Sequence, residues 1–218
     1  MESMSESLSS LTQLKTLSIC VAKDSTKLWE ALRGLNIKSL ILGENIERLT
    51  VNHTESLSET LSSLTKLRML SIRLKEDVPG LCRALRGLNV KSLSLKVEYR
   101  GFKVNRVELL SQSLSSLTKL ETLSTSVEKD STGLWKALRG LNIKRLSLSG
   151  WWLEGLDLNH VELMSQSLRS LTNLEKLSIC VSKEGAGLWG ALRGLNIKRL
   201  SLSGRLSVNN VELLSQSL

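Results

Sequence analysis

Histidine and cysteine, the residues that most often carry chemistry, are few in this chain and widely spaced. The two histidines, His53 and His160, each follow an asparagine at the expected start of a helix, far apart in the sequence. Such a pair can form neither a zinc site, which needs several ligands, nor a Ser-His-Asp arrangement, whose members must touch. We therefore expect both histidines to be exposed residues at helix starts.

The three cysteines are an odd number, which fits poorly with a disulfide framework. Cys20 and Cys180 occupy the same strand position in the first and last copies of a repeat. The usual spacing of strands puts them roughly 29 Å apart, whereas a disulfide needs Cα atoms within about 7 Å. Cys82 stands where other copies have tryptophan, so it should pack against its own helix. All three are predicted to be thiols that form no disulfide.

Phosphate-binding and acid-base motifs are also missing from the sequence. A P-loop needs a Gly-Lys pair, which the chain does not contain, and the glycines of ALRGLN do not form a GxGxxG turn. Aspartate and glutamate do not recur as a close pair on the expected strand face. We therefore expect a protein that is not an enzyme, with no cofactor, no metal and no small-molecule substrate.

The formal net charge of +9 would suit an acidic partner such as nucleic acid. The basic residues recur at similar places in each repeat, which favours the simpler interpretation of a solvated face. Nucleic acid is thus the less favoured partner, and binding to it would have to show a steep dependence on salt. The chain also has no long apolar run and no signal-peptide pattern at its start, so we expect no membrane contact and a cytoplasmic location.

Two phrases alternate along the chain and define its repeats. Type A units read LSSLTQLKTLSI or a close variant, and type B units read ALRGLNIKSLIL or a close variant; each occurs four times. Type B follows type A after 23 residues, and type A follows type B after 30 or 31. Residues 1–218 are therefore expected to form one array of four tandem pairs of 53 or 54 residues. Neither end has a polar capping unit, so the chain is expected to be a fragment truncated at both ends.

Each unit predicts a helix followed by a strand. Leucines recur at helical spacing, as at Leu110, Leu114 and Leu117, and apolar residues then alternate in the strand. The recurring tryptophans Trp29, Trp135 and Trp189 are expected to be packing residues of the short helices. The long helices should begin with a capping box, an asparagine three residues before a glutamate, at Asn52, Asn105, Asn159 and Asn209. The short helices should end at glycines in the left-handed conformation, Gly34, Gly87, Gly140 and Gly194.

The LxxLxL phrase followed by a helix resembles the leucine-rich repeat, and the resemblance covers essentially the whole chain. The alternation of two helical unit types is similar to the ribonuclease-inhibitor class, which includes the repeat arrays of intracellular nucleotide-binding immune receptors. The asparagine that usually closes the strand turn is present once, at Asn45; the equivalent places hold Glu98, Trp151 and Arg205. The resemblance implies an α/β solenoid, a curved horseshoe with eight parallel strands on its concave face and helices on its convex face.

The same resemblance implies a protein-protein interaction module. One hypothesis is the ligand-sensing or regulatory array of an intracellular receptor-like protein. The alternative is a scaffold, inhibitor or substrate adaptor that clamps a partner enzyme. An attached nucleotide-binding domain would favour the first hypothesis, and an attached degradation or adaptor motif would favour the second.

The partner-binding site is predicted at the loops that leave the type B strands and at the adjoining concave edge. These loops differ most between repeats, and they hold the only tyrosine and the only phenylalanine. Aromatic and arginine side chains are the usual anchors of protein interfaces, although these loops could instead fold back over their own repeats. The predicted site comprises Tyr99, Arg100, Phe102, Arg145, Trp151, Trp152, Arg199 and Arg205.

Overall fold

The computed structural model describes residues 4–43, 49–76, 78, 80–97, 107–126, 132–150, 158–181 and 187–204. Helices and strands alternate along these residues. The helices are α1 (Met4–Ser10), α2 (Thr26–Leu32), α3 (Thr54–Ser63), α4 (Leu81–Leu85), α5 (Val107–Ser116), α6 (Thr132–Leu138), α7 (Leu158–Ser170) and α8 (Gly187–Leu192). The strands are β1 (Thr16–Ile19), β2 (Ser39–Leu42), β3 (Met69–Leu74), β4 (Ser92–Val97), β5 (Thr122–Ser126), β6 (Arg145–Gly150), β7 (Lys176–Val181) and β8 (Arg199–Gly204).

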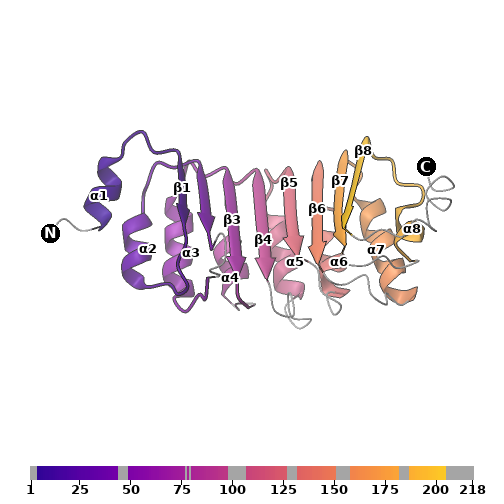
Figure 1. The fold of residues 1–218 in the computed structure, drawn as a ribbon, viewed down its shortest axis with the longest axis horizontal. Coiled ribbons are helices and arrows are strands. Elements are labelled where there is room, and N and C mark those ends of the chain that lie inside the picture. Colours follow the sequence, from indigo (N-terminus) through magenta and orange to yellow (C-terminus); the bar gives the residue numbers. More distant parts are fainter. Residues whose placement is uncertain are drawn as a thin grey trace. The chain divides into compact units, whose positions relative to one another are not determined.

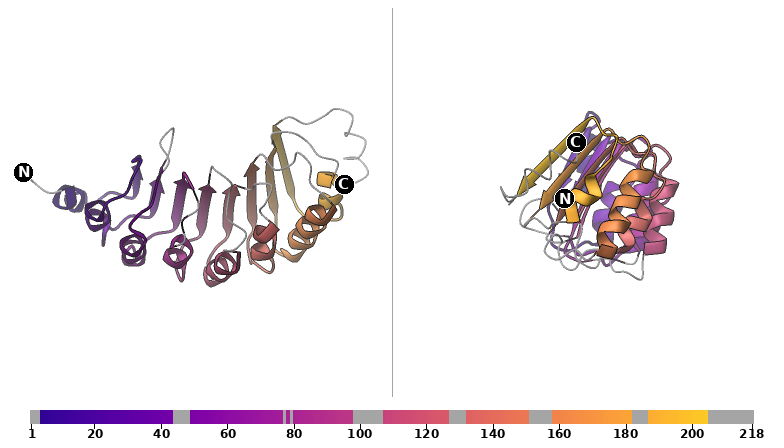
Figure 2. Two further views of the ribbon diagram at one scale, coloured as in Figure 1. Left: turned by 90° about the horizontal axis from the view of Figure 1, so that it is seen from below. Right: turned by 90° about the vertical axis from the view of Figure 1, so that its right-hand side faces the viewer.

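The chain forms two compact units, one of residues 1–99 and 112–120 and the other of residues 100–111 and 121–218, called unit 1 and unit 2. Unit 1 contains β1 to β4 and unit 2 contains β5 to β8. Within each unit the four strands pair in parallel in the order of the sequence. Figures 1 and 2 show that the helices of a unit lie on one side of its strands. The prediction of an α/β repeat protein with eight parallel strands is thus confirmed at the level of each unit.

A ladder of leucines aligns the strands. The second residue of every strand in unit 1 is leucine, and the pairing joins Leu17 to Leu40, Leu40 to Leu70 and Leu70 to Leu93. The last three of these side chains are buried beneath the helices. Burying a leucine stabilises a fold by about 1.5–3 kcal/mol, so a repeated leucine position strongly favours one register. The same ladder recurs in unit 2.

The serine-rich sequence of the long helices joins them to the preceding short helices. Hydroxyl groups of the long helices donate to backbone carbonyl oxygens of the short helices in three equivalent bonds, Thr60 to Trp29, Ser113 to Cys82 and Ser167 to Trp135. One turn later, a second hydroxyl accepts from the backbone N–H of a glycine, in the pairs Ser63–Gly34, Ser116–Gly87 and Ser170–Gly140. Both kinds of bond recur wherever a described short helix precedes a described long one.

The glycines that end the short helices have the predicted conformation. Gly34, Gly87, Gly140 and Gly194 have φ between 69° and 75°. A Cβ atom at any of these glycines would meet nothing within 4 Å. Glycine is therefore required by the backbone conformation and not by crowding.

The predicted capping box at Asn52 is wrong. Helix α3 begins at Thr54, and its N-cap residue, His53, makes no side-chain capping bond. Instead the buried carboxylate of Asp24 accepts hydrogen bonds from the backbone N–H groups of Asn52 and His53, at 2.8 and 2.9 Å. An ionised carboxylate forms stronger bonds to these groups than an asparagine amide does, so the preceding repeat supplies the cap.

Of the other three predicted caps, only Asn159 lies among the described residues. Asn159 lies inside α7, which begins at Leu158, so it is not the N-cap there either. Asn105 and Asn209 lie outside the described residues.

The histidine, cysteine and tryptophan side chains differ in their exposure. His53 lies at the start of α3 as expected, and its side chain is 41% exposed, but its Nδ1 atom lies 3.3 Å from the Asp24 carboxylate, a contact that the sequence did not predict. His160 lies in α7. The prediction of no disulfide is confirmed, with Cys20 and Cys180 exposed and Cys82 buried. The three recurring tryptophans of the short helices, Trp29, Trp135 and Trp189, are buried as predicted.

Candidate functional site

Each strand presents alternate side chains on the face away from the helices, which we call the strand face. Because the leucine ladder fixes the register, equivalent residues of neighbouring strands stand side by side and form columns. The central column is polar and nearly uniform, and we call it the serine floor. Its members are Ser18, Ser71 and Ser94, with Ile41, in unit 1, and Ser124, Ser147, Ser178 and Ser201 in unit 2.

Two residues of the predicted site lie on the strand face of unit 2. Arg145 and Arg199 are the first residues of β6 and β8, and both are exposed. The structure brings these two into one column, separated by a single strand. The other predicted residues, Tyr99, Arg100, Phe102, Trp151, Trp152 and Arg205, lie outside the described residues.

The strand between the two arginines contributes a third cation that the site prediction omitted. Lys176 begins β7 and pairs with Arg145 on one side and Arg199 on the other. We call these three residues the basic row. The sequence held the signal for Lys176, because the repeat alignment places it in the same column. The prediction missed it because it considered only type B units, whereas a column crosses type A and type B units in turn.

The glutamates beside the basic row form ion pairs with lysines. Just before the strands of unit 2, Lys198 contacts Glu175 at 2.9 Å and Lys144 contacts Glu121 at 3.7 Å. The hydrogen bond and the charge of Lys198, with smaller contributions from Lys144 and Arg145, lower the pKa of the Glu175 carboxyl. Glu175 is therefore ionised at neutral pH and is bonded to Lys198 rather than to the row.

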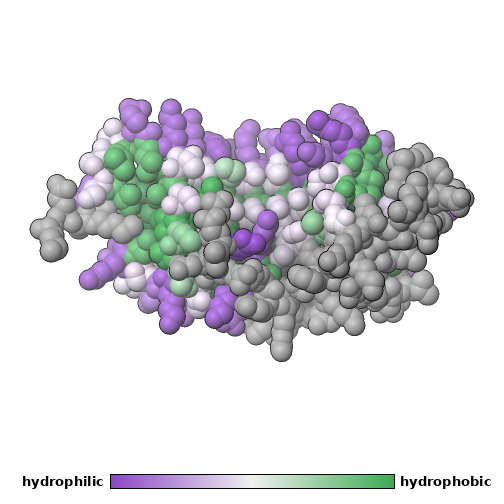
Figure 3. All heavy atoms as spheres, in the orientation of Figure 1, coloured by the Kyte–Doolittle hydropathy of each residue, from purple (hydrophilic) through white to green (hydrophobic). Residues whose placement is uncertain are grey.

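Unit 1 has no basic row at the start of its strands, although its strand face carries a pair of cations further along, Arg73 and Lys96. The column equivalent to the basic row holds the uncharged residues Thr16, Ser39, Met69 and Ser92. The position before each strand of unit 1 is basic instead, with Lys15, Lys38, Arg68 and Lys91. Figure 3 shows hydrophilic side chains along the edge where the strands begin, at the top of the view. The two units thus share a framework but differ in the chemistry of their strand faces.

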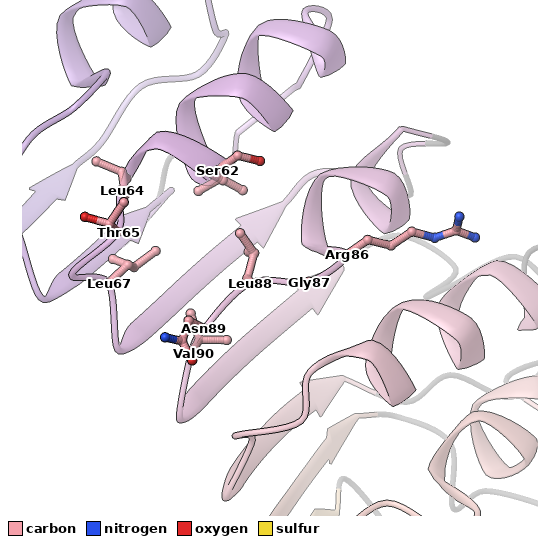
Figure 4. Close-up of a pocket in the computed structure, with 10 residues that line it drawn as sticks. Ser62, Leu64, Thr65, Leu67, Arg86, Gly87, Leu88, Asn89 and Val90 are labelled. Carbon is pink, nitrogen blue, oxygen red and sulfur yellow. The ribbon is translucent and has the colours of Figure 1, made fainter.

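Three pockets of the described surface lie at equivalent places in the repeat. A pocket of about 270 Å³ lies between residues 61–67, at the end of α3 and the turn after it, and residues 86–90, after α4 (Figure 4). Pockets of about 240 and 290 Å³ occupy the equivalent places beside residues 33–37 and residues 194–197. Leu64, Leu67 and Leu88, which line the first pocket, are buried core residues. Recurrence at equivalent places indicates gaps set by unit spacing and not a dedicated ligand site.

The described part of the chain lacks two other features. Within it, no cluster of three or more histidine, cysteine, aspartate or glutamate side chains is arranged to hold a metal ion. None of its helices combines the length and apolar character that crossing a bilayer would require.

Neither family models nor curated proteins match this chain. Its function must therefore be inferred from its repeats and its surface.

Proposed function

We propose that this chain is a leucine-rich repeat module that binds another protein on its strand face. One observation carries the proposal: the repeats agree at the inward leucine and in the serine floor, and they differ in the outward column beside that floor. The inward position holds leucine in every strand, as at Leu70 and Leu146. The outward column beside it changes from threonine, serine and methionine in unit 1 to arginine and lysine in β6, β7 and β8 of unit 2.

The form of the strand face suits a protein partner better than a small molecule. Small-molecule sites are concave and enclose most of the ligand, whereas the serine floor presents short side chains in a row. Ser147 and Ser178 are half-buried, and Ser201 is exposed. Short hydroxyl side chains let a partner's surface approach closely and can both donate and accept hydrogen bonds.

The resemblance to intracellular immune-receptor arrays extends the proposal to a cellular role. In this view the module is the ligand-sensing or regulatory array of a receptor-like protein in the cytoplasm. The exposed thiols of Cys20 and Cys180 are compatible with a reducing compartment, where such groups remain unbridged.

Site-specific photo-crosslinking in cells tests the proposal. A benzophenone amino acid would replace Ser178 or Ser201 on the strand face of the full chain. Matched controls would replace Lys136 or Arg193, exposed residues in and directly after helices of the same unit. We expect both strand-face positions to give the same discrete protein adduct and the control positions to give none. Equal labelling from both sets, or no adduct from the strand face, would contradict the proposal.

A further inference from the structure

Three cations stand in adjacent strands on the strand face of unit 2. Arg145, Lys176 and Arg199 are successive partners in the strand register. Arg145 and Arg199 are exposed and Lys176 is half-buried. Like charges on directly opposite residues of neighbouring strands repel each other and disfavour the pairing. An anionic ligand that lay across the three strands would relieve this repulsion.

The neighbouring acidic groups form their ion pairs with lysines outside the row, although the charge of Arg145 also acts on Glu175. Glu121 and Glu175 pair with Lys144 and Lys198, which precede β6 and β8. Among the residues that the structure describes, no carboxylate forms an ion pair with Arg145, Lys176 or Arg199. The three cations therefore remain available to a ligand on the described surface.

From this arrangement we infer that the basic row binds an extended acidic peptide segment lying across β6, β7 and β8. The inference rests on the proposed function and specifies the partner: a segment with carboxylates at positions i and i+3. Neighbouring parallel strands lie about 4.8 Å apart. Arg145 and Arg199 are two strands apart, so their Cα atoms are separated by about 9.6 Å. A polyproline II segment repeats its faces every three residues and rises about 9.3 Å over that distance, which matches the two arginines.

The remaining groups fit such a peptide. Lys176 lies between the two arginines, where its ammonium group can donate to carbonyl oxygens of the peptide backbone. The serine floor beside it, Ser147, Ser178 and Ser201, offers hydroxyl groups and no bulk. An extended peptide leaves its carbonyl groups unpaired, so it presents acceptors that these donors can satisfy.

Two observations favour a peptide over nucleic acid. Proteins that bind single-stranded nucleic acid stack its bases on aromatic side chains, and the described residues of the three strands include none. Glu121 and Glu175 also lie directly beside the row, where they would repel a continuous phosphate backbone more than a segment with spaced carboxylates.

A fluorescent peptide of repeated Glu-Pro-Pro triplets would test the inference by anisotropy with the full chain. The first variant combines Arg145→Ser and Arg199→Ser, which installs the residues found at the equivalent places in unit 1, Ser39 and Ser92. The matched control, Lys136→Ser with Arg193→Ser, removes the same charge outside the strand face. We expect the first pair to weaken binding at least tenfold and the control pair to change it less than twofold. Lys176→Thr, which copies Thr122 of the preceding type A strand, should weaken binding severalfold.

The outcomes that would overturn the inference are separate. Equal losses in both variant pairs would indicate only general attraction between opposite charges. Equal binding of a peptide of the same composition with adjacent glutamates would exclude the spacing match. Tighter binding of a single-stranded oligonucleotide, with loss in the Arg145→Ser and Arg199→Ser pair, would indicate a nucleic-acid site.

Crosslinking at Ser178 in the arginine variant separates the acidic-peptide inference from the proposed function. A crosslinked partner at Ser178 that persists in the arginine pair would uphold protein binding and refute the acidic peptide.

Discussion

Replacing Asp24 with asparagine should reveal how one buried carboxylate joins two repeats. Its Oδ2 atom accepts the indole N–H of Trp29 at 2.8 Å and the backbone N–H of His53 at 2.9 Å. Its Oδ1 atom accepts the backbone N–H of Asn52 at 2.8 Å. Asparagine can keep an oxygen at only one of these places. Its amide nitrogen would then face a backbone N–H, and two donors would oppose each other.

The magnitude follows from the bonds that are lost. A hydrogen bond to a charged group contributes about 1.5–3 kcal/mol, and a buried donor left without a partner costs about 1–3 kcal/mol. Asp24→Asn loses at least one such bond and the negative charge at the start of α3, so we expect a loss of about 2–4 kcal/mol in the free energy of unfolding. Urea unfolding followed by circular dichroism measures this loss. Hydrogen exchange at the Asn52 and His53 amides should show whether it is local.

The control is Glu30→Gln, which makes the same isosteric change at an exposed position of α2. Surface substitutions of this kind change stability by less than about 0.5 kcal/mol. If Asp24→Asn destabilised the chain no more than Glu30→Gln did, the carboxylate would not be the cap that the geometry indicates.

The pH dependence gives a second test of the same residue. Burial raises the pKa of Asp24, but the hydrogen bonds from Asn52, Trp29 and His53 together outweigh burial and lower it below the ordinary value of 3.8. Because the pKa of Asp24 is lower in the folded state than in the unfolded state, its ionised carboxylate stabilises the fold. This stabilisation is fully present above pH 3.8 and is lost as the pH falls through the folded-state pKa. The stability difference between the wild type and Asp24→Asn should therefore be constant near neutral pH and shrink below pH 3.8.

Three other changes have defined expectations. Thr60→Val removes the hydroxyl that donates to the Trp29 carbonyl at 2.9 Å; it should destabilise the chain by about 1–3 kcal/mol in urea, and the exposed change Ser62→Ala should have little effect. Gly34→Ala meets no steric obstacle but must adopt φ of 75°, so a loss of about 1–2 kcal/mol is expected, and an unchanged midpoint would count against the backbone argument. Ellman's reagent should detect two thiols per native chain, at Cys20 and Cys180, and a third, Cys82, after unfolding; a single reactive thiol after unfolding without reductant would instead indicate a disulfide.

The fold could be predicted from the sequence because its signals are local and repeated. The leucine spacing indicates helices and strands, and the 23- and 30-residue separations bring equivalent strands together. Gly34 and Gly87 mark helix ends because the left-handed backbone conformation that ends a helix favours glycine. The helix, strand and glycine signals lie within a few residues of the features they specify, and the repeat spacing places these features at regular intervals.

The cap of α3 could not be predicted in the same way. Asn52 has the right residue type at the right spacing, but Asp24 lies in the preceding repeat and competes for the same backbone groups. A carboxylate is the stronger acceptor, so the distant residue prevails over the local one. The sequence did contain a trace of this arrangement. Asp24 precedes Trp29 by the same spacing as Asp130 precedes Trp135.

The basic row lies between these two cases. Arg145 and Arg199 belong to type B units, whose divergent loops point to them in the sequence, whereas Lys176 belongs to a type A unit and joins them only through the strand register. The residues of a column on the strand face are brought together only by the register between neighbouring strands. The leucine ladder sets this register independently of the outward residues. The outward residues can therefore change without loss of the fold, as the uncharged Ser39, Met69 and Ser92 of unit 1 show. A repeat of this kind separates the residues that determine register from those exposed on the strand face, so the proposed binding surface is defined across the strands and not along the chain.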